Sequence, residues 1–190
     1  MIFQICKCGY CRDVVFPMLY QLPNICWYEI PKNGSSTVKT NVQHTRIQQP
    51  IGDILVVVRD PIVRAWSTFM HYMMPGANKY TMMRDWFAHR FNIQLDDYDI
   101  NSKVQIFFDH FRAYDTHAKV HHMYPQTYFI DRQYESQFRV IDISKLTAEL
   151  GVPVENNTEY LDKQQPQFTK TQLAILEDIY KEDYEFIAKI

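Results

Sequence analysis

Residues 27–37 have the sequence WYEIPKNGSST. An apolar run ends at Pro31, and a lysine, a glycine and three hydroxyl residues follow before VKTNVQH (38–44), which can continue as a helix. The first turn of a helix presents backbone N–H groups without partners, and the helix dipole adds partial positive charge there. A strand, a loop and a helix in this order are therefore typical of a site that holds an anion.

The loop supplies donors of several kinds. Lys32 brings a full charge, Gly34 permits close approach of the backbone to an anion, and the hydroxyls of Ser35, Ser36 and Thr37 can donate hydrogen bonds. The order differs from the nucleotide-triphosphatase pattern Gly-x-x-x-x-Gly-Lys-Ser/Thr, because Lys32 precedes the glycine. Taken alone, the loop favours an ordinary turn and helix cap. A second motif is needed to favour an anion-binding site instead.

Beyond this loop, strands and helices alternate along the chain. Residues 54–58 are all apolar, as in strands that are covered on both faces. We expect an α/β fold, a three-layer sandwich with a central parallel sheet flanked by helices. The periodicity predicts strands at 24–30, 53–60, 127–130 and 138–143, and helices at 35–44, from Pro61, at 82–91, 104–111 and 144–151, and over 169–190.

Length and composition bound the function classes. With 190 residues, 46% of them hydrophobic, the chain can bury one core, and we expect a single domain over residues 1–190. A net charge of −2 gives no general attraction to nucleic acid, and no apolar stretch approaches the roughly 20 residues that span a bilayer. The expectation is a cytoplasmic protein without a membrane span.

Four cysteines lie near the start of the chain. Their spacing could in principle supply thiolates to zinc, but structural zinc sites usually pair two Cys-x-x-Cys elements, so unpaired thiols are the favoured interpretation. No metal site is predicted. The residues are Cys6, Cys8, Cys11 and Cys26.

The second motif is VVVRDPIVRAWSTF, residues 56–69. It places Arg59 at the carboxyl end of a strand, Asp60 where it can cap a helix and Pro61 at the first helical position. Ser67 follows Asp60 by about two turns of that helix. Because ligands of α/β sheets bind at strand ends, Arg59 and Ser67 can hold a second phosphate. For Arg64 we favour a structural role, in a salt bridge across the start of this helix.

Together the two motifs resemble those of sulfotransferases that use 3′-phosphoadenosine 5′-phosphosulfate (PAPS). Lys-x-Gly-Ser-Ser-Thr follows one strand, and Arg-Asp-Pro-x-x-Arg-x-x-Ser follows the next. The pattern is most similar to the carbohydrate branch, found as Golgi enzymes in animals and as soluble enzymes in microbes. The resemblance implies a P-loop-like fold and a small soluble microbial or viral member of the family.

The resemblance also implies roles for the loop residues. The first loop would hold the 5′-phosphosulfate through Lys32, Asn33, Gly34, Ser35, Ser36 and Thr37, and the second would hold the 3′-phosphate through Arg59 and Ser67. HHMYPQ (121–126) is similar to the family's His-x-x-Pro-Gln stretch, and ILEDIYKEDYEFI (175–187) to its last helix. Lys32 would be catalytic, and the transfer would need no metal, because positioning and charge stabilisation do most of the work in such transfers.

The acceptor hydroxyl needs a base. His122 is the leading candidate because it lies in the family-like stretch, and His121, His44 and His71 remain open. The expected acceptor is a small molecule or glycan, which Arg84, Arg90, Arg112 and Lys119 would meet if it is acidic. A solvated helix face is the favoured interpretation of these four residues. Loop position suggests that Thr158, Lys163 and Gln164 close over the nucleotide.

Two alternatives remain open at this stage. An atypical small-molecule kinase would use ATP and magnesium, and a non-catalytic module would bind the nucleotide without transferring anything.

Overall fold

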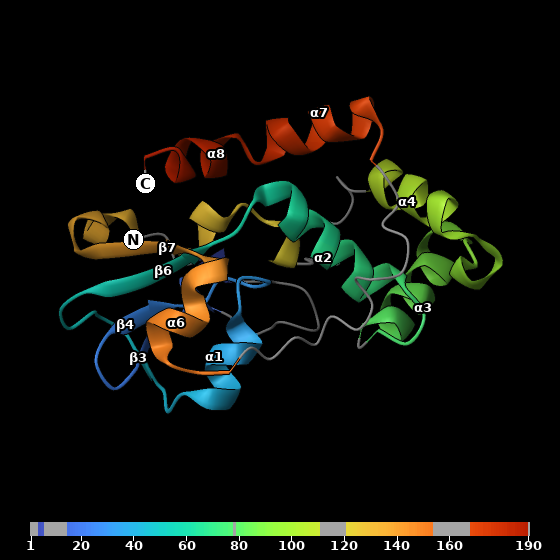
Figure 1. Cartoon of the computed structure of the whole chain (residues 1–190). Coiled ribbons are helices and arrows are strands. Elements are labelled where there is room, and N and C mark those ends of the chain that lie inside the picture. The colour runs from blue at the N-terminus through green and yellow to red at the C-terminus, as the bar shows by residue number, and fades with distance from the viewer. Residues whose placement is uncertain (1–3, 6–14, 78, 111–120, 154–167, 190) are drawn as a thin grey trace.

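The computed structural model describes residues 4–5, 15–77, 79–110, 121–153 and 168–189. It shows an α/β protein built on a five-stranded sheet with the order β5-β3-β4-β6-β7 (Figure 1). The strands are β3 (Leu19–Gln21), β4 (Cys26–Tyr28), β5 (Thr45–Ile47), β6 (Ile54–Val58) and β7 (Phe138–Asp142). A separate two-stranded pair joins β1 (Gln4–Ile5) to β2 (Val15–Phe16).

The sheet is mixed, which corrects the expectation of a parallel sheet. Strands β4, β6 and β7 run parallel to one another, whereas β3 is antiparallel to both β4 and β5. The sequence pattern missed β3 and β5 because each has three residues and β5 is largely exposed. The parallel part carries both predicted motifs, since β4 leads into the first loop and β6 into the second.

Both faces of β6 are covered, as its apolar run predicts. Val56 packs with Phe186 of α8 (Lys181–Ile187) and with Phe129 of the 3-10 helix η4 (Gln126–Phe129). On the other face, Leu55 packs with Val38 and Leu146. Those two residues belong to α1 (Ser35–Asn41) and α6 (Leu146–Leu150), and Figure 1 shows α1 and α6 on the opposite side of the sheet from α8.

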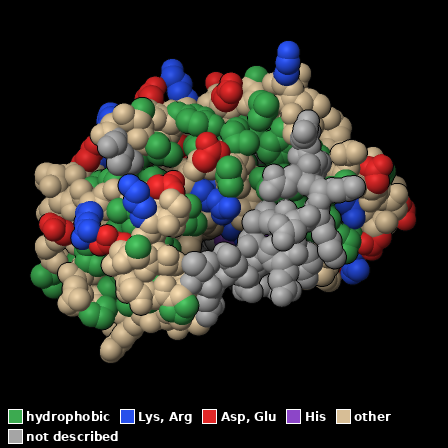
Figure 2. Space-filling view, in the orientation of Figure 1, with side chains coloured by type: hydrophobic (Ala, Val, Ile, Leu, Met, Phe, Trp, Pro, Cys, Tyr) green, Lys and Arg blue, Asp and Glu red, His purple; other side chains and the backbone are tan. Residues whose placement is uncertain are grey.

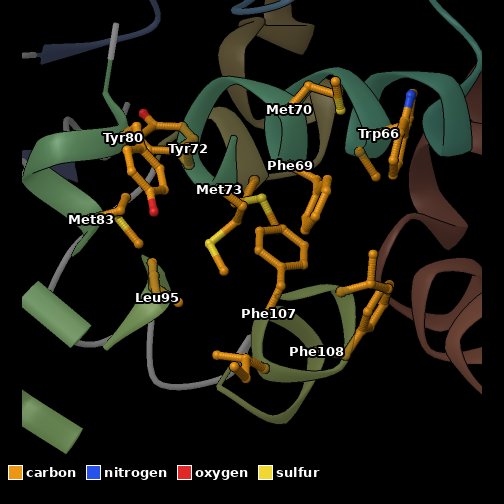
Figure 3. Close-up of a cluster of buried hydrophobic side chains, with 14 of the residues drawn as sticks. Trp66, Phe69, Met70, Tyr72, Met73, Tyr80, Met83, Leu95, Phe107 and Phe108 are labelled. Atoms are coloured by element: carbon orange, nitrogen blue, oxygen red, sulfur yellow. The ribbon is translucent and has the colours of Figure 1, made fainter. Parts of the chain in front are cut away.

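Beyond the sheet, a second hydrophobic cluster joins three helices: α2 (Pro61–Met73), α3 (Tyr80–Phe91) and α4 (Ile100–Asp109). In Figure 3 aromatic and methionine side chains from α2 face those from α3 and α4, with Phe69 and Phe107 edge to face at 5.4 Å between ring centroids. The expected helical pattern at 82–91, and the part of the pattern at 104–111 that the structure describes, thus pack into this core, whereas Phe111 lies outside the described residues. Helix α2 connects this cluster to the sheet (Figure 1).

Two expected elements differ from the structure. Residues 127–130 form no strand, because the N–H groups of Gln126 and Thr127 donate to Asp183, at 2.8 and 3.0 Å, and the chain turns as η4 instead. The expected final helix is two helices, α7 (Lys170–Ile179) and α8, which meet at Tyr180.

The remaining short helices are 3-10 turns. They are η1 (Leu95–Asp97), η3 (His121–Met123), η5 (Arg132–Gln137) and η6 (Ile143–Lys145). Across the described ranges, no helix combines the length and the apolar character that a membrane crossing needs.

Candidate functional site

The first loop begins with a tight turn after β4. The N–H of Asn33 donates to the Ile30 carbonyl at 3.1 Å, so Pro31 and Lys32 are the central residues of a four-residue turn. Lys32 has a φ of 69°, in the left-handed region that non-glycine residues rarely adopt. Proline at the second position and a positive φ at the third are the signature of a type II turn, in which glycine usually takes the place that Lys32 occupies.

Helix α1 follows at once, with Gly34 as its N-cap at a φ of 83°. No side chain caps this helix, and the described residues offer no hydrogen-bond acceptor to the N–H groups of Gly34, Ser35, Ser36 and Thr37. Helix α2, by contrast, is capped by Asp60, which accepts from the N–H of Val63. The first turn of α1 therefore has donors available for an anion.

Position 34 favours glycine because of its positive φ and also because a neighbouring side chain leaves no room for a Cβ. A Cβ on Gly34 would lie 2.3 Å from Cδ2 of Leu146, at the start of α6. On this side of Gly34 the space is therefore filled by an apolar side chain from another element.

The second motif reaches back to the first loop through two arginines. Nη1 of Arg59 donates to the carbonyl of Lys32 at 3.2 Å, and Nε of Arg64 donates to the carbonyl of Pro31 at 3.0 Å. Arg64 is fully buried, and its Nη1 also donates to the carbonyl of Tyr124 at 2.7 Å. Arg64 is therefore structural, as we favour from the sequence, but it binds carbonyls rather than an acidic partner.

These residues make a strongly positive site in a protein of net charge −2. Burial, with Arg59 and Arg64 as like charges nearby, lowers the pKa of Lys32 to about 8. Burial also lowers the pKa of Arg59, although Asp142 and Asp60 oppose this. Within the described ranges, neither Lys32, Arg59 nor Arg64 forms an ion pair with a carboxylate. In Figure 2 lysine and arginine side chains gather near the middle of the face shown.

Gln126 ties the two loops together. Its Oε1 accepts from the N–H of Arg59 at 2.9 Å and from Nδ2 of Asn33, and its Nε2 donates to the Arg59 carbonyl at 2.8 Å. Asp183 of α8, itself fully buried, accepts from the N–H groups of Gln126 and Thr127 and from the Thr127 hydroxyl at 3.2 Å. Residues of the two later stretches, 121–126 and 175–187, thus hold the loops in place through hydrogen bonds.

The side chains of two predicted binding residues, Asn33 and Ser35, donate their hydrogen bonds to other groups of the protein. Asn33 is buried, and its Nδ2 donates to Val57 and Gln126. The Ser35 hydroxyl donates to the Ile30 carbonyl at 2.9 Å, which uses its only proton. Ser36 is exposed, Thr37 is buried in the first turn of α1, and Ser67 is partly exposed on α2.

The candidate bases lie in two places. His122 packs against His71 and Tyr72 at the far end of α2, with ring centroids 5.4 and 5.5 Å apart, and its carbonyl accepts from Thr68. His44 follows α1, edge to face with Tyr20, and its Nδ1 lies 2.9 Å from the Val42 carbonyl. His121 begins η3.

The other predicted residues are divided between surface positions and undescribed ranges. Arg84 forms ion pairs with Asp85 and Asp96 on the surface of α3, and Arg90 is exposed on the same helix, as a solvated face predicts. Cys26 is a buried free thiol in β4, and the described ranges contain no cluster of metal-ligating side chains. Outside the described residues lie Cys6, Cys8, Cys11, Arg112, Lys119, Thr158, Lys163 and Gln164.

The sequence does not predict the contacts that fix the geometry of the first loop. Arg64 binding to Pro31 and Leu146 filling the space beside Gly34 carry no local signal, because both contacts join elements far apart in the chain. The Pro-Gln pair and the aspartate of the last helix were visible as patterns, but only the geometry shows them as braces. Comparison of the chain with protein-family models, curated proteins and solved structures finds no match.

Proposed function

We propose that this protein is a PAPS-dependent sulfotransferase that transfers a sulfuryl group to an acceptor hydroxyl, of a sugar or a small molecule. The observation that carries the proposal is the convergence of Lys32, Arg59 and Arg64 around the turn before α1 without a described carboxylate partner. Buried cations in this arrangement are costly unless an anion completes the site.

The relation of the two loops supports a ligand with two anionic groups. Both loops follow neighbouring parallel strands, β4 and β6, and Arg59 contacts the first loop directly. One group would lie at Lys32 and the N–H groups of the first turn of α1, and the other at Arg59 and Ser67. As part of the same proposal, the parallel strands β4, β6 and β7 belong to a three-layer, P-loop-like domain.

The chemistry follows from the donor set. PAPS would supply the sulfuryl group; the bond between its sulfur and the bridging oxygen breaks as the acceptor oxygen bonds to that sulfur. A base takes the acceptor proton, and 3′,5′-ADP leaves with the bonding electrons. Lys32, which is mainly protonated at pH 7, would neutralise the charge that develops on the bridging oxygen, with the N–H groups of α1 as further donors.

His122, His121, His44 and His71 all remain candidate bases in this proposal. His122 remains the candidate that the family-like stretch suggests. His44 offers a defined tautomer, because a carbonyl can only accept, so Nδ1 facing the Val42 carbonyl carries the proton and Nε2 of the neutral ring is left to take one. Replacing each with alanine and comparing turnover at saturating PAPS identifies the base.

A transfer assay with ³⁵S-labelled PAPS and a panel of sugar and phenolic acceptors, in the presence of a chelator, tests the function. We expect transfer in the wild type and none in Lys32→Ala or Arg59→Ala, both folded by circular dichroism. Full activity in either variant would refute the assignment. ATP-dependent phosphorylation that the chelator abolishes would indicate a kinase, and nucleotide binding without any transfer would indicate a binding module.

A further inference from the structure

The turn from Ile30 to Asn33 can exist in two forms. Types I and II share the same end residues and differ mainly in the orientation of the central peptide, here the one that joins Pro31 to Lys32. In type II the third residue has a positive φ, whereas in type I its φ is about −90°. Lys32, with a φ of 69°, adopts the form that a lysine does not favour by itself.

Arg64 holds the atom that distinguishes the two forms. The carbonyl of the central peptide belongs to Pro31, and it accepts from Nε of Arg64 at 3.0 Å. A flip to type I would turn this carbonyl away from Arg64 and leave a buried guanidinium N–H without a partner. A charge-assisted hydrogen bond to a buried carbonyl outweighs the cost of one left-handed lysine.

Arg64 is itself fixed. It has no exposed surface, its Nη1 donates to the Tyr124 carbonyl at 2.7 Å, and its guanidinium lies over the ring of Phe129 at 5.7 Å from the centroid. Because it is enclosed on all sides, it cannot touch a ligand in the described geometry. Any effect on the site must pass through the peptide that it holds.

We propose that Arg64 is a positioning residue: by holding the Pro31 carbonyl it selects the type II turn, and through the backbone of Lys32 it sets the direction of the lysine ammonium. The effect on nucleotide affinity rests on the proposed sulfotransferase function. The effect on the turn does not, since it concerns the free protein.

NMR of the free protein can determine which type of turn residues 30–33 form. The distance from Hα of residue 31 to the amide proton of residue 32 is short in a type II turn and long in a type I turn, so the corresponding NOE reports the form. We expect a strong NOE in the wild type and in the control Arg139→Gln, which loses only an exposed ion pair with Glu149. In Arg64→Lys and Arg64→Gln the NOE should weaken.

A third variant covers the case in which both Arg64 variants fail to fold. Lys32→Ala removes the ammonium but leaves Arg64 in place, so the strong NOE should persist although alanine also disfavours a positive φ. A weak NOE in Lys32→Ala, or an unchanged one in a folded Arg64 variant, would overturn the proposal.

Calorimetric titration with 3′,5′-ADP then tests the consequence. Arg64→Lys should weaken binding about tenfold in the wild-type background and leave the residual binding of Lys32→Ala unchanged, because Arg64 acts through Lys32. A merely structural role would weaken both equally. If the wild type binds no 3′,5′-ADP, the proposed function fails, and the NOE still decides the role of Arg64.

Discussion

At the scale of single residues, the candidate site is energetically unfavourable in the protein without a ligand. Lys32 takes a backbone conformation that costs about 1–2 kcal/mol for a non-glycine residue, and it lies near two other cations. Its lowered pKa, about 8, reports that the folded protein disfavours the ammonium. Costs of this kind persist at functional sites, where a ligand offsets them.

Replacing Lys32 with methionine should therefore stabilise the free protein. The folded pKa of Lys32 lies below the unfolded value of 10.5, so the penalty is fully present below pH 8 and disappears as the pH approaches 10.5. We expect Lys32→Met to raise the free energy of unfolding by roughly 1–3 kcal/mol at pH 7, with a smaller gain at pH 9.5. Urea denaturation at both pH values measures the gain.

Lys181→Met is the matched control, because Lys181 is exposed on α8 and should give no change. A less stable Lys32→Met at pH 7 would show that the ammonium has a favourable partner in the free protein, contrary to this account of the site.

Nucleotide affinity should depend on pH through the same group. An anion favours the charged lysine, so binding raises the pKa of Lys32 and takes up a proton once the free amine begins to deprotonate near pH 8. The Kd for 3′,5′-ADP should stay constant from pH 7 to 7.5 and weaken by up to about tenfold per pH unit above 8. Lys32→Arg should remove this dependence, and a flat profile in the wild type would exclude Lys32 as the anion ligand.

At the scale of elements, the first loop is held between α6 and α8. On one side Leu146 of α6 fills the space beside Gly34, and on the other Asp183 of α8 holds Gln126, which contacts both loops. The loop geometry therefore depends on two helices that follow it by more than 100 residues.

Gly34→Ala should lower the free energy of unfolding by about 2–4 kcal/mol, through a left-handed alanine and the overlap of its Cβ with Leu146. Leu146→Ala removes the overlap and also the buried contacts of Leu146 with Leu55 and Val38, a cost that the cycle subtracts because it is present with either residue at position 34. In a double-mutant cycle measured by thermal denaturation, the two changes should therefore couple by about 1–3 kcal/mol. Additive effects would show that α6 does not press on the loop.

Asp183→Asn should lower the free energy of unfolding by about 2–4 kcal/mol, because an amide nitrogen cannot accept the bonds from Gln126 and Thr127. Glu182→Gln, one residue earlier and exposed, is the control and should have little effect. Chemical denaturation of both variants makes the comparison. Equal stability of the two would mean that α8 packs on the sheet without bracing the loops.

At the scale of the whole molecule, the sequence predicts the elements whose signal is local. The apolar run of β6, and Asp60 with Pro61 at the start of α2, each determine an element, and the structure confirms both. The short strands β3 and β5 carry no such signal, since each becomes a strand only by pairing with a neighbour.

The same distinction holds for the site. The sequence identifies Lys32, Gly34 and Arg59 by their order around two strands, and the structure brings their loops together. It does not reveal that Asn33 and Ser35 donate to the protein itself, because Val57, Gln126 and the Ile30 carbonyl become neighbours of these side chains only in the folded chain.

We propose that the two loops together hold a nucleotide with two anionic groups. Calorimetric titration of the wild type, Arg59→Ala and the control Arg139→Gln with 3′,5′-ADP, in the presence of a chelator, tests it most directly. We predict binding in the wild type and the control and a loss of at least tenfold in Arg59→Ala, since a charge-assisted hydrogen bond contributes about 1.5–3 kcal/mol. No binding in the wild type, or equal affinity in Arg59→Ala, would show that the two loops do not form this site.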